Sequence, residues 1–438
     1  MIHHNSSRRD FLKGSAGIVA GAAAAGAILL PQGGVYAAGA DETIKIGLVG
    51  CGGRGTGACG QALKTKGPVK LVAIGDAFED NAKGALRTLK NDPQLSERIE
   101  VSDDKIFHGF DAYKQVIDSG VDLVILATPP GFRPMHFEYA VEKGKNIFME
   151  KPVAVDAPGV RQVLAAAEKA KQKNLKVGVG LQRHHSARYN DTIKRIQDGA
   201  LGDLVLLRVY WNDAGVWVRP RKPGQTEMEY QMRNWYYFCW LCGDHINEQH
   251  IHNLDVANWV KGAYPAKAQG QGGRQVRTGK ENGEIYDHHF VEYTYPDGTV
   301  MLSQCRHQPD TWRSVSEHAH GTKGTADISG FRMTMRDGTE WRSRERGGDD
   351  YQVEHDHLFD AIRNNKPYNE AENGAKSTMT AILGRMCTYS GQEIKWDDAI
   401  NSKIALRPEG YTFDSKPPTT PDAEGWYPIP MPGRTKTV

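Results

Sequence analysis

Lys151 and a histidine-rich segment near residue 250 carry the side chains best suited to proton transfer. Histidine changes its charge near neutral pH, so His252, which lies among carboxylates, suits general acid–base catalysis. Glu248, His252 and Asp255 follow one another at helical spacing, which predicts that they share one face of a helix over residues 246–260. A lysine beside another cation loses some proton affinity and can then help to move the proton of a hydroxyl group. Lys151, Glu248 and His252 are therefore the candidate catalytic residues.

The histidine-rich segment is open to a second interpretation. His245, His250 and His252, together with neighbouring acids, are candidate ligands of a metal ion. They give no full ligand set on one helical face, so we favour proton transfer and expect no metal. Which of the three histidines is the acid–base residue stays open, although the spacing favours His252. We expect Asp244, His245 and Asp255 to contact the substrate.

A glycine-rich motif predicts a bound dinucleotide. Residues 50–55, Gly-Cys-Gly-Gly-Arg-Gly, fit G-x-G-x-x-G and stand between an apolar strand and a helix. Glycines let the backbone approach a pyrophosphate, and the helix N-terminus supplies amide donors. Asp76 ends the next strand, where a carboxylate hydrogen-bonds ribose hydroxyls and repels a 2′-phosphate, which favours NAD over NADP. The expected cofactor-binding residues are Gly50, Gly52, Gly53, Arg54, Gly55, Asp76, Thr128, Pro129, Glu150 and Lys151.

Strands and helices alternate over the first part of the chain. This alternation predicts an α/β Rossmann domain, a doubly wound parallel sheet, over residues 42–182. Glu150-Lys151-Pro152 follows one of the strands, and ligands bind at the carboxyl ends of such strands, so we expect Lys151 at the mouth of the site. The expected strands are 44–49, 69–74, 121–127, 146–149 and 176–180, and the expected helices are 58–66, 136–143 and 158–173.

The pattern changes after Arg183. Alternating strands joined by the turn Pro296-Asp297-Gly298 indicate antiparallel sheet. We therefore predict that residues 183–438 form an α+β domain with a large open antiparallel sheet. Its expected strands include 205–210, 287–295 and 299–305, and its expected helices are 246–260, 352–364 and 372–390.

The N-terminus has the layout of a secretory signal. Ser7-Arg8-Arg9-Asp10-Phe11-Leu12-Lys13 resembles a twin-arginine motif, the run 14–30 is apolar, and Val35-Tyr36-Ala37 has the small residues of a cleavage site. The apolar run is short and weakly apolar for a membrane span, so we expect export rather than an anchor. Residues 1–37 are thus predicted to be a twin-arginine signal peptide that directs the protein to the periplasm.

Charge and cysteine content exclude other classes of protein. The net charge of +2 equals that of the predicted signal (three basic residues and one acidic), so the remaining chain is neutral. It has no excess of basic residues of the kind that binds nucleic acid. Six cysteines in 438 residues do not make a disulfide scaffold. Cys239 and Cys242 have redox or zinc spacing but no second pair, and we expect them to be packed, buried thiols.

The glycine loop, Glu150-Lys151-Pro152 and the Glu248–His252 segment, in this order, resemble the Gfo/Idh/MocA family of glucose–fructose oxidoreductases and inositol dehydrogenases. The resemblance implies a Rossmann domain and a second domain whose sheet commonly mediates homo-oligomers. It also implies hydride exchange between a nicotinamide and a sugar or cyclitol carbinol, with Lys151 and His252 handling the proton. The chain departs from the family at Cys242-Gly243-Asp244, where a glycine run is usual, and at Arg183-His184-His185.

Export has a consequence for the expected chemistry. Outside the cytoplasm no pool of free nicotinamide cofactor is maintained, so the protein should hold NAD tightly and complete a redox-neutral cycle. We favour an oxidoreductase acting on a sugar, glycoside or cyclitol hydroxyl. The alternatives are an NAD-dependent glycoside hydrolase, working by transient oxidation, elimination, water addition and re-reduction, and a sugar-binding or sensing protein.

All nine tryptophans lie at Trp211 or later, and we expect Trp235 and Trp240 to cover the sugar.

Overall fold

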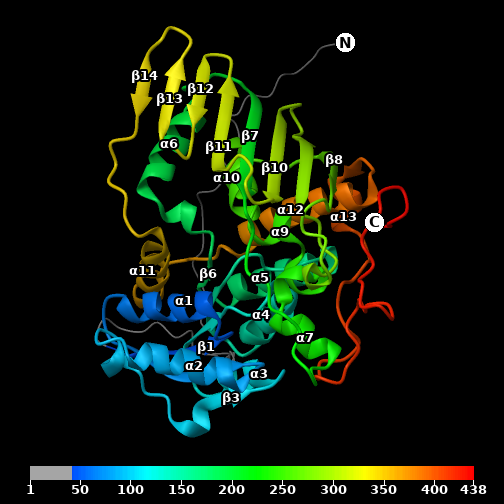
Figure 1. Ribbon diagram of the computed structural model, residues 1–438. Coiled ribbons are helices and arrows are strands. Elements are labelled where there is room, and N and C mark those ends of the chain that lie inside the picture. The colour runs from blue at the N-terminus through cyan, green and yellow to red at the C-terminus, as the bar shows by residue number, and fades with distance from the viewer. Residues whose placement is uncertain (1–41) are drawn as a thin grey trace, which may run out of the picture. The chain divides into compact units, whose positions relative to one another are not determined.

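The computed structural model describes residues 42–438, which hold two β-sheets and the helices around them (Figure 1). The predicted signal peptide, residues 1–37, lies outside these residues. Within the described part, no helix is long and apolar enough to span a membrane.

The first sheet has six strands in the order β3-β2-β1-β4-β5-β6, and all its paired strands are parallel. Its central strands are almost entirely apolar and buried, as a sheet covered on both faces requires. The strand order reverses between β1 and β4, the position at which such sheets bind ligands. The strands are β1 (Ile44–Val49), β2 (Val69–Asp76), β3 (Ile106–His108), β4 (Leu123–Leu126), β5 (Asn146–Met149) and β6 (Val177–Val179).

Helices cover both faces of this sheet, which confirms the doubly wound fold. One apolar cluster joins one face to α1 (Gly53–Lys64), α2 (Glu79–Lys90) and α11 (Asp350–Arg363). A second cluster joins the other face to α3 (Ala112–Asp118), α4 (Arg133–Glu142) and α5 (Ala157–Gln172). The predicted boundary at residue 182 stays a prediction, but α11 comes from far beyond it and still packs on the first sheet through Leu358 and Phe359.

The second sheet has nine strands in the order β14-β13-β12-β11-β7-β10-β9-β8-β15. The predicted large open antiparallel sheet is confirmed: its pairs are antiparallel except β7 with β10, which run parallel. A long connection between β7 and β10 takes the place of a hairpin and allows this pairing. The strands are β7 (Leu204–Asp213), β8 (Lys267–Gly273), β9 (His288–Thr294), β10 (Val300–His307), β11 (Ser314–Gly321), β12 (Gly324–Asp327), β13 (Arg332–Met335), β14 (Glu340–Arg342) and β15 (Ile394–Lys395).

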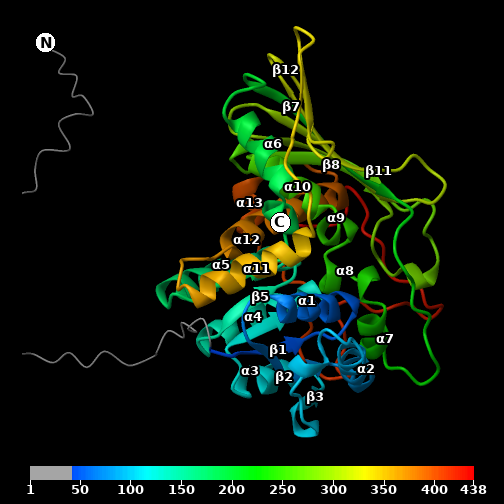
Figure 2. The same ribbon diagram turned by 90° about the vertical axis from the view of Figure 1, so that its left-hand side faces the viewer.

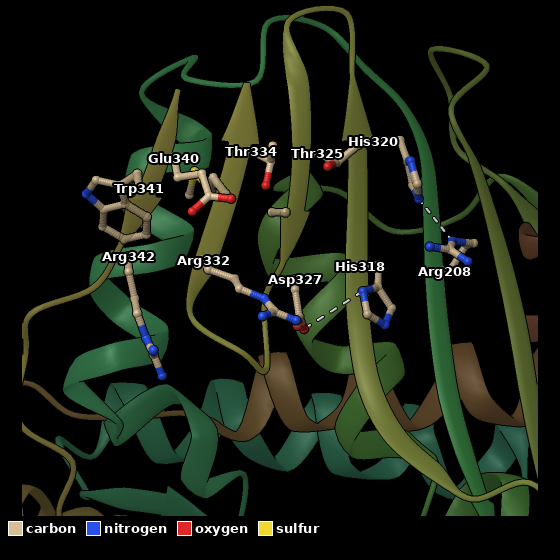
Figure 3. A pocket seen from close by; sticks show the side chains of 12 residues that line it. Arg208, His318, His320, Thr325, Asp327, Arg332, Thr334, Glu340, Trp341 and Arg342 are labelled. Atoms are coloured by element: carbon tan, nitrogen blue, oxygen red, sulfur yellow. Dashed lines mark hydrogen bonds and ion pairs between the residues drawn. The ribbon is translucent and has the colours of Figure 1, made fainter. Parts of the chain in front are cut away.

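Helices cover one face of the second sheet. The other face carries a polar hollow of about 610 Å³ over β7 and β11–β14, with Arg208, His318 and Asp327 among its side chains (Figure 3). The remaining helices are α6 (Ala187–Gln197), α7 (Glu227–Arg233), α8 (Cys239–Cys242), α9 (His245–Glu248), α10 (Ile251–Lys261), α12 (Ala371–Ser390) and α13 (Trp396–Ile400).

Helix α12 joins the two domains. It packs on β8 and β9 on one side and on α5 of the Rossmann domain on the other (Figures 1 and 2). Every residue from Ser377 to Ser390 is buried. Arg385 donates from one guanidinium to the carbonyl oxygens of Val155 (2.7 Å) and Gly243 (3.0 Å), one in each domain.

The histidine-rich segment is not the single helix predicted over residues 246–260. Helix α9 ends at Glu248 and α10 begins at Ile251. Two tertiary hydrogen bonds stabilise the interruption between the two helices. Gln249 Oε1 lies 2.6 Å from His307 Nε2, and His250 Nε2 lies 2.8 Å from Ser303 Oγ. These contacts to β10 override the helical periodicity of the sequence.

Candidate active site

A cavity of about 740 Å³ opens at the carboxyl ends of β1, β2 and β4. One wall consists of the glycine loop, Asp76, Thr128 and Pro129. The opposite wall comes from the second domain, through residues 214–235, which we call the cover segment. The cavity residues of the cover segment are Trp217, Arg219, Pro220, Lys222, Gln225, Met232, Arg233 and Trp235.

The glycines of the loop have different roles. Gly50 has a φ of +93°, and a Cβ there would lie 2.4 Å from the amide nitrogen of Thr128. A Cβ on Gly55 would lie 1.9 Å from the carbonyl oxygen of Gly50, so these two glycines are required by backbone packing. Gly52 and Gly53 face open space, because a Cβ on either would have no atom within 4 Å. The space in front of Gly52 and Gly53, at the N-terminus of α1, is where a pyrophosphate would bind.

Asp76 ties the end of β2 to the glycine loop. Its carboxylate accepts hydrogen bonds from the amides of Cys51 (2.7 Å) and Phe78 (2.9 Å) and from Asn81 Nδ2 (3.1 Å). Burial raises the pKa of Asp76, and these hydrogen bonds oppose the rise. Because Asp76 also lines the cavity, its position agrees with the predicted contact to the ribose.

Arg133, which belongs to no motif of the sequence, organises the ends of β4 and β5. Its buried guanidinium donates to the carbonyl oxygens of Thr128 (2.5 Å) and Glu150 (3.0 Å). Burial lowers the pKa of Arg133 to about 10. The Glu150 side chain pairs instead with Arg54 of α1, with Nε and Oε1 2.6 Å apart. Arg54 and Glu150 thus bind each other beside the cofactor cavity.

The structure brings Lys151 and Glu248 together across the two domains. Lys151 Nζ donates to Glu248 Oε1 (2.9 Å) and to its carbonyl oxygen (2.5 Å). The side chains are 13% and 15% exposed, so the pair is largely screened from water yet still reachable. This contact places the ammonium that follows β5 at the last residue of α9.

His252 completes the group. Its ring stacks on Trp211, with centroids 5.9 Å apart. Burial first, and then the charges of Lys151 and Arg183, hold the pKa of His252 well below its ordinary range, so the imidazole is neutral at pH 7. Its Nδ1 is buried and has no hydrogen-bond partner among residues 42–438.

A buried ion pair next to His252 has no signal in the sequence. Arg183 Nη1 contacts Glu317 Oε1, and the same carboxylate accepts from Asn253 Nδ2 (2.5 Å) and Tyr189 Oη (3.1 Å). Glu317 lies on β11, and a lone acidic residue in the sequence does not indicate such a partner. The pair supplies one of the positive charges that keep His252 neutral.

The hydrogen bonds of Asp255 are made to α12 and to His184. Its carboxylate accepts from Ser377 Oγ (2.7 Å) and Asn373 Nδ2 (3.1 Å) and pairs with His184 Nε2 (2.7 Å). Since α9 and α10 are separate helices, Asp255 does not share a face with Glu248, and its carboxylate binds α12 rather than a substrate.

Asp244, His245 and Trp240 are also too deeply buried to reach a substrate. Asp244 and His245 have no exposed surface, and Trp240 is 2% exposed in an aromatic core. Trp235 lines the cofactor cavity rather than the surroundings of His252. The tryptophan beside His252 is Trp211.

The ligand set of the alternative metal hypothesis does not assemble. His250 binds Ser303, and His252 stacks on Trp211, while His245 stacks on His307. Cys239 and Cys242 are buried free thiols, as expected.

Gly52→Asp separates cofactor binding from folding. Aspartate is a favourable N-cap residue for α1, so we expect unchanged or slightly higher thermal stability. Its charge would repel a pyrophosphate, and we expect NAD affinity, measured by calorimetry, to fall by about 10- to 100-fold. Gly52→Ala is the matched control and should bind NAD normally. Equal NAD affinity in the two variants would contradict this placement of the pyrophosphate.

Asp255→Asn distinguishes a structural role from a substrate contact. Breaking the buried pair with His184 should lower the free energy of unfolding in urea by about 3 kcal/mol at pH 6. Asp255 raises the pKa of His184 against the opposing effect of burial. The stabilisation from the charged pair is therefore complete below the ordinary histidine pKa and is lost as pH rises through the raised value, so the deficit should shrink by pH 8.5. Full stability with a raised KM for substrate would instead support the predicted substrate contact.

Residues 44–180 match the model of the Gfo/Idh/MocA oxidoreductase family, an NAD-binding Rossmann fold. Scyllo-inositol 2-dehydrogenase (NAD(+)) of Bacillus subtilis (strain 168) is 25% identical over 232 residues, 53% of this chain and 58% of that protein. Inositol 2-dehydrogenase of Ralstonia nicotianae is 28% identical over 237 residues, 52% of this chain and 57% of that protein. The chain thus spans a little over half the length of the curated relatives it matches.

Solved structures share the fold of both domains. An oxidoreductase of Thermotoga maritima superposes with a TM-score of 0.62 at 18% identity, covering 82% of this chain and 99% of that one. Scyllo-inositol dehydrogenase of Lactobacillus casei, with bound NAD(H) and scyllo-inositol, has a TM-score of 0.61 at 22% identity, covering 81% and 99%. The glycine loop, the parallel sheet and the family match thus coincide on residues 44–180, where the chain is similar to the NAD-binding Rossmann fold of the Gfo/Idh/MocA oxidoreductase family.

Proposed function

We propose that the protein is an NAD-dependent oxidoreductase that acts on one hydroxyl-bearing carbon of a sugar, glycoside or cyclitol. The observation that carries the proposal is the Lys151–Glu248 pair at the carboxyl end of β5, whose ammonium is near enough to His252 to help lower the pKa of that imidazole. This group has a hydrogen-bond donor and a neutral base, the two elements that alcohol oxidation needs.

Bound NAD would accept the hydride from the carbinol carbon. Lys151 Nζ, held by Glu248, would donate a hydrogen bond to the hydroxyl oxygen and stabilise the negative charge that develops there. The neutral imidazole of His252 would accept the hydroxyl proton. In the reverse direction the same two side chains would return the proton.

The relatives support the substrate class. Two of the curated relatives are inositol dehydrogenases, and one solved neighbour holds scyllo-inositol. Rings of this kind have an apolar face that an aromatic side chain can cover. We propose Trp211, which stacks on His252, for that contact in place of Trp235 and Trp240.

The cover segment supports tight retention of the cofactor. Arg233, at the end of α7, packs on the Phe78 ring at 3.6 Å and forms two hydrogen bonds with Asp80 (2.9 and 3.0 Å). The C-terminal tail holds α7 in turn, because Gln231 donates to the carbonyl oxygen of Thr419 (2.8 Å). Release of NAD would require these contacts to open.

Retention of NAD fits the export predicted for residues 1–37, and we propose a periplasmic location after twin-arginine transport. We further propose that the chain forms homo-oligomers through the helix-free face of the second sheet. Size-exclusion chromatography with light scattering tests the oligomer.

Purified protein should release about one NAD(H) per chain on denaturation. Arg233→Ala removes the contacts with Phe78 and Asp80 of the Rossmann domain. It should speed NAD release, measured by cofactor fluorescence, by about three- to tenfold. Lys83→Ala, which breaks an exposed ion pair on α2, is the control and should release NAD at the wild-type rate. Neither bound nor bindable NAD in the wild type would contradict the proposed function.

Lys151→Ala and His252→Ala should each lower kcat by about 10²- to 10⁴-fold while NAD content stays normal. A protonated imidazole cannot accept the hydroxyl proton, so the rate should fall as pH drops through the lowered pKa of His252. We therefore expect a flat profile from pH 6 upward and a loss only at more acidic pH. The control is His288→Ala, a half-exposed histidine of β9.

Full activity in both catalytic variants would show that the site is assigned wrongly. Products identified by mass separate the enzyme classes: a keto-sugar supports the oxidoreductase. Release of an aglycone, with solvent deuterium beside the oxidised carbon, supports the hydrolase.

A further inference from the structure

Asp244, His245 and His289 form a buried cluster at the start of α9. Asp244 and His245 have no exposed surface, and His289 is 3% exposed. One donor atom from each residue lies within 4.8 Å of the other two. His245 Nε2 is 3.8 Å from Asp244 Oδ1, and His289 Nε2 is 3.3 Å from Asp244 Oδ2. Among residues 42–438, no other trio of His, Cys, Asp or Glu side chains has this arrangement.

The histidine nitrogens of this cluster lack partners. Neither Nδ1 nor Nε2 of His245 has a hydrogen bond within residues 42–438, and His289 Nε2 has none either. Buried polar atoms in native proteins are nearly always paired. Each unpaired group costs about 1–3 kcal/mol, and His289 Nε2 has only the Asp244 carboxylate beside it, so the two unpaired nitrogens of His245 indicate a missing partner.

His289 presents its Nε2 to Asp244. Thr388 Oγ1 donates its hydrogen to the carbonyl oxygen of Arg385 (3.1 Å) and lies 2.9 Å from His289 Nδ1, which holds the ring in place. Nε2 faces Asp244 Oδ2 3.3 Å away, a separation that either a shared proton or a bound cation bridges. A hydrogen-bonded Nδ1 is also the usual support of a histidine that binds metal through Nε2.

The Asp244 carboxylate is held rigidly in place. Tyr389 Oη (2.6 Å) and the Tyr286 amide (3.0 Å) both donate to Oδ2. The backbone of Asp244 has φ +70° and ψ 162°, a region that residues other than glycine adopt at a cost of about 1–3 kcal/mol. The fold thus accepts strain at Asp244 to present this carboxylate to the two histidines.

We propose that Asp244, His245 and His289 bind one divalent transition-metal ion, for which zinc is the representative probe. Two imidazole nitrogens and one carboxylate oxygen suit this class of ion. Zinc binds such donors at about 2.0–2.2 Å, so donor pairs of one ion lie about 3–4 Å apart, as the two measured pairs do. The ion would anchor the start of α9, the helix that ends at Glu248. This site revises the expectation of no metal and does not depend on the proposed redox activity.

The test measures metal in protein purified without chelator or metal-affinity resin, and then in chelator-treated protein titrated with Zn²⁺ or Co²⁺. We expect one ion per chain and the visible absorption of tetrahedral Co²⁺. His289→Gln and Asp244→Asn should bind less than a tenth as much. His355→Gln is the matched control, because His355 is buried with both ring nitrogens unpartnered in α11, outside the cluster. This variant should keep one ion.

Wild-type protein that neither retains nor takes up one equivalent would overturn the proposal, as would wild-type binding in His289→Gln. If the variants do not fold, anomalous scattering from zinc-soaked wild-type crystals decides. A peak between the three side chains supports the site, and no peak there overturns it. NAD content is measured on the same samples: NAD without metal refutes this inference alone, and metal without NAD refutes the proposed function alone.

Discussion

The hydrogen-bonded ion pair between Lys151 and Glu248 is the contact on which the candidate active site depends. It joins the end of a strand in the Rossmann domain to the end of a helix in the second domain. Because both side chains are mostly buried, the attraction is stronger than in a surface pair. The contact holds the Lys151 ammonium at the end of α9, where its charge helps to lower the pKa of His252.

Other buried contacts hold the strand end at Lys151 and the helix end at Glu248 in fixed positions relative to each other. Helix α12 lies between the second sheet and α5, and Arg385 bonds to a carbonyl of each domain. Asp255 fastens α10 to α12 through Ser377, and the tertiary bonds of Gln249 and His250 set the break between α9 and α10. Several buried polar contacts therefore serve to position three side chains at one place.

The sequence predicted the parts of the site that depend on local pattern. The glycine loop, Asp76 and Lys151 follow apolar strands of a parallel sheet, so their shared edge follows from the alternation of strands and helices. The pairing of Glu248 with Lys151 and the neutral state of His252 depend on residues far away in the chain. The prediction of a single helix was wrong because contacts to β10 separate α9 from α10. Glu248 and Asp255 therefore do not share a helical face.

Other differences have the same origin. The parallel pairing of β7 with β10 cannot be predicted from alternation, because a strand with one buried face alternates in the same way whichever direction its neighbour runs. We expected Trp235 and Trp240 at the sugar, but Trp240 is part of the core, Trp235 faces the cofactor cavity and Trp211 stacks on His252. Residue type indicates the kind of chemistry, and tertiary packing determines which side chains come together.

In the proposed reaction a carbinol hydrogen passes as hydride to NAD bound in the cavity under the cover segment. A direct measurement is a single turnover with a sugar or inositol deuterated at its carbinol carbons, followed by mass analysis of the nucleotide released on denaturation. We expect reduced NAD that is heavier by one deuterium. Reduced NAD without deuterium, or loss of the label to solvent while the nucleotide stays oxidised, would contradict it.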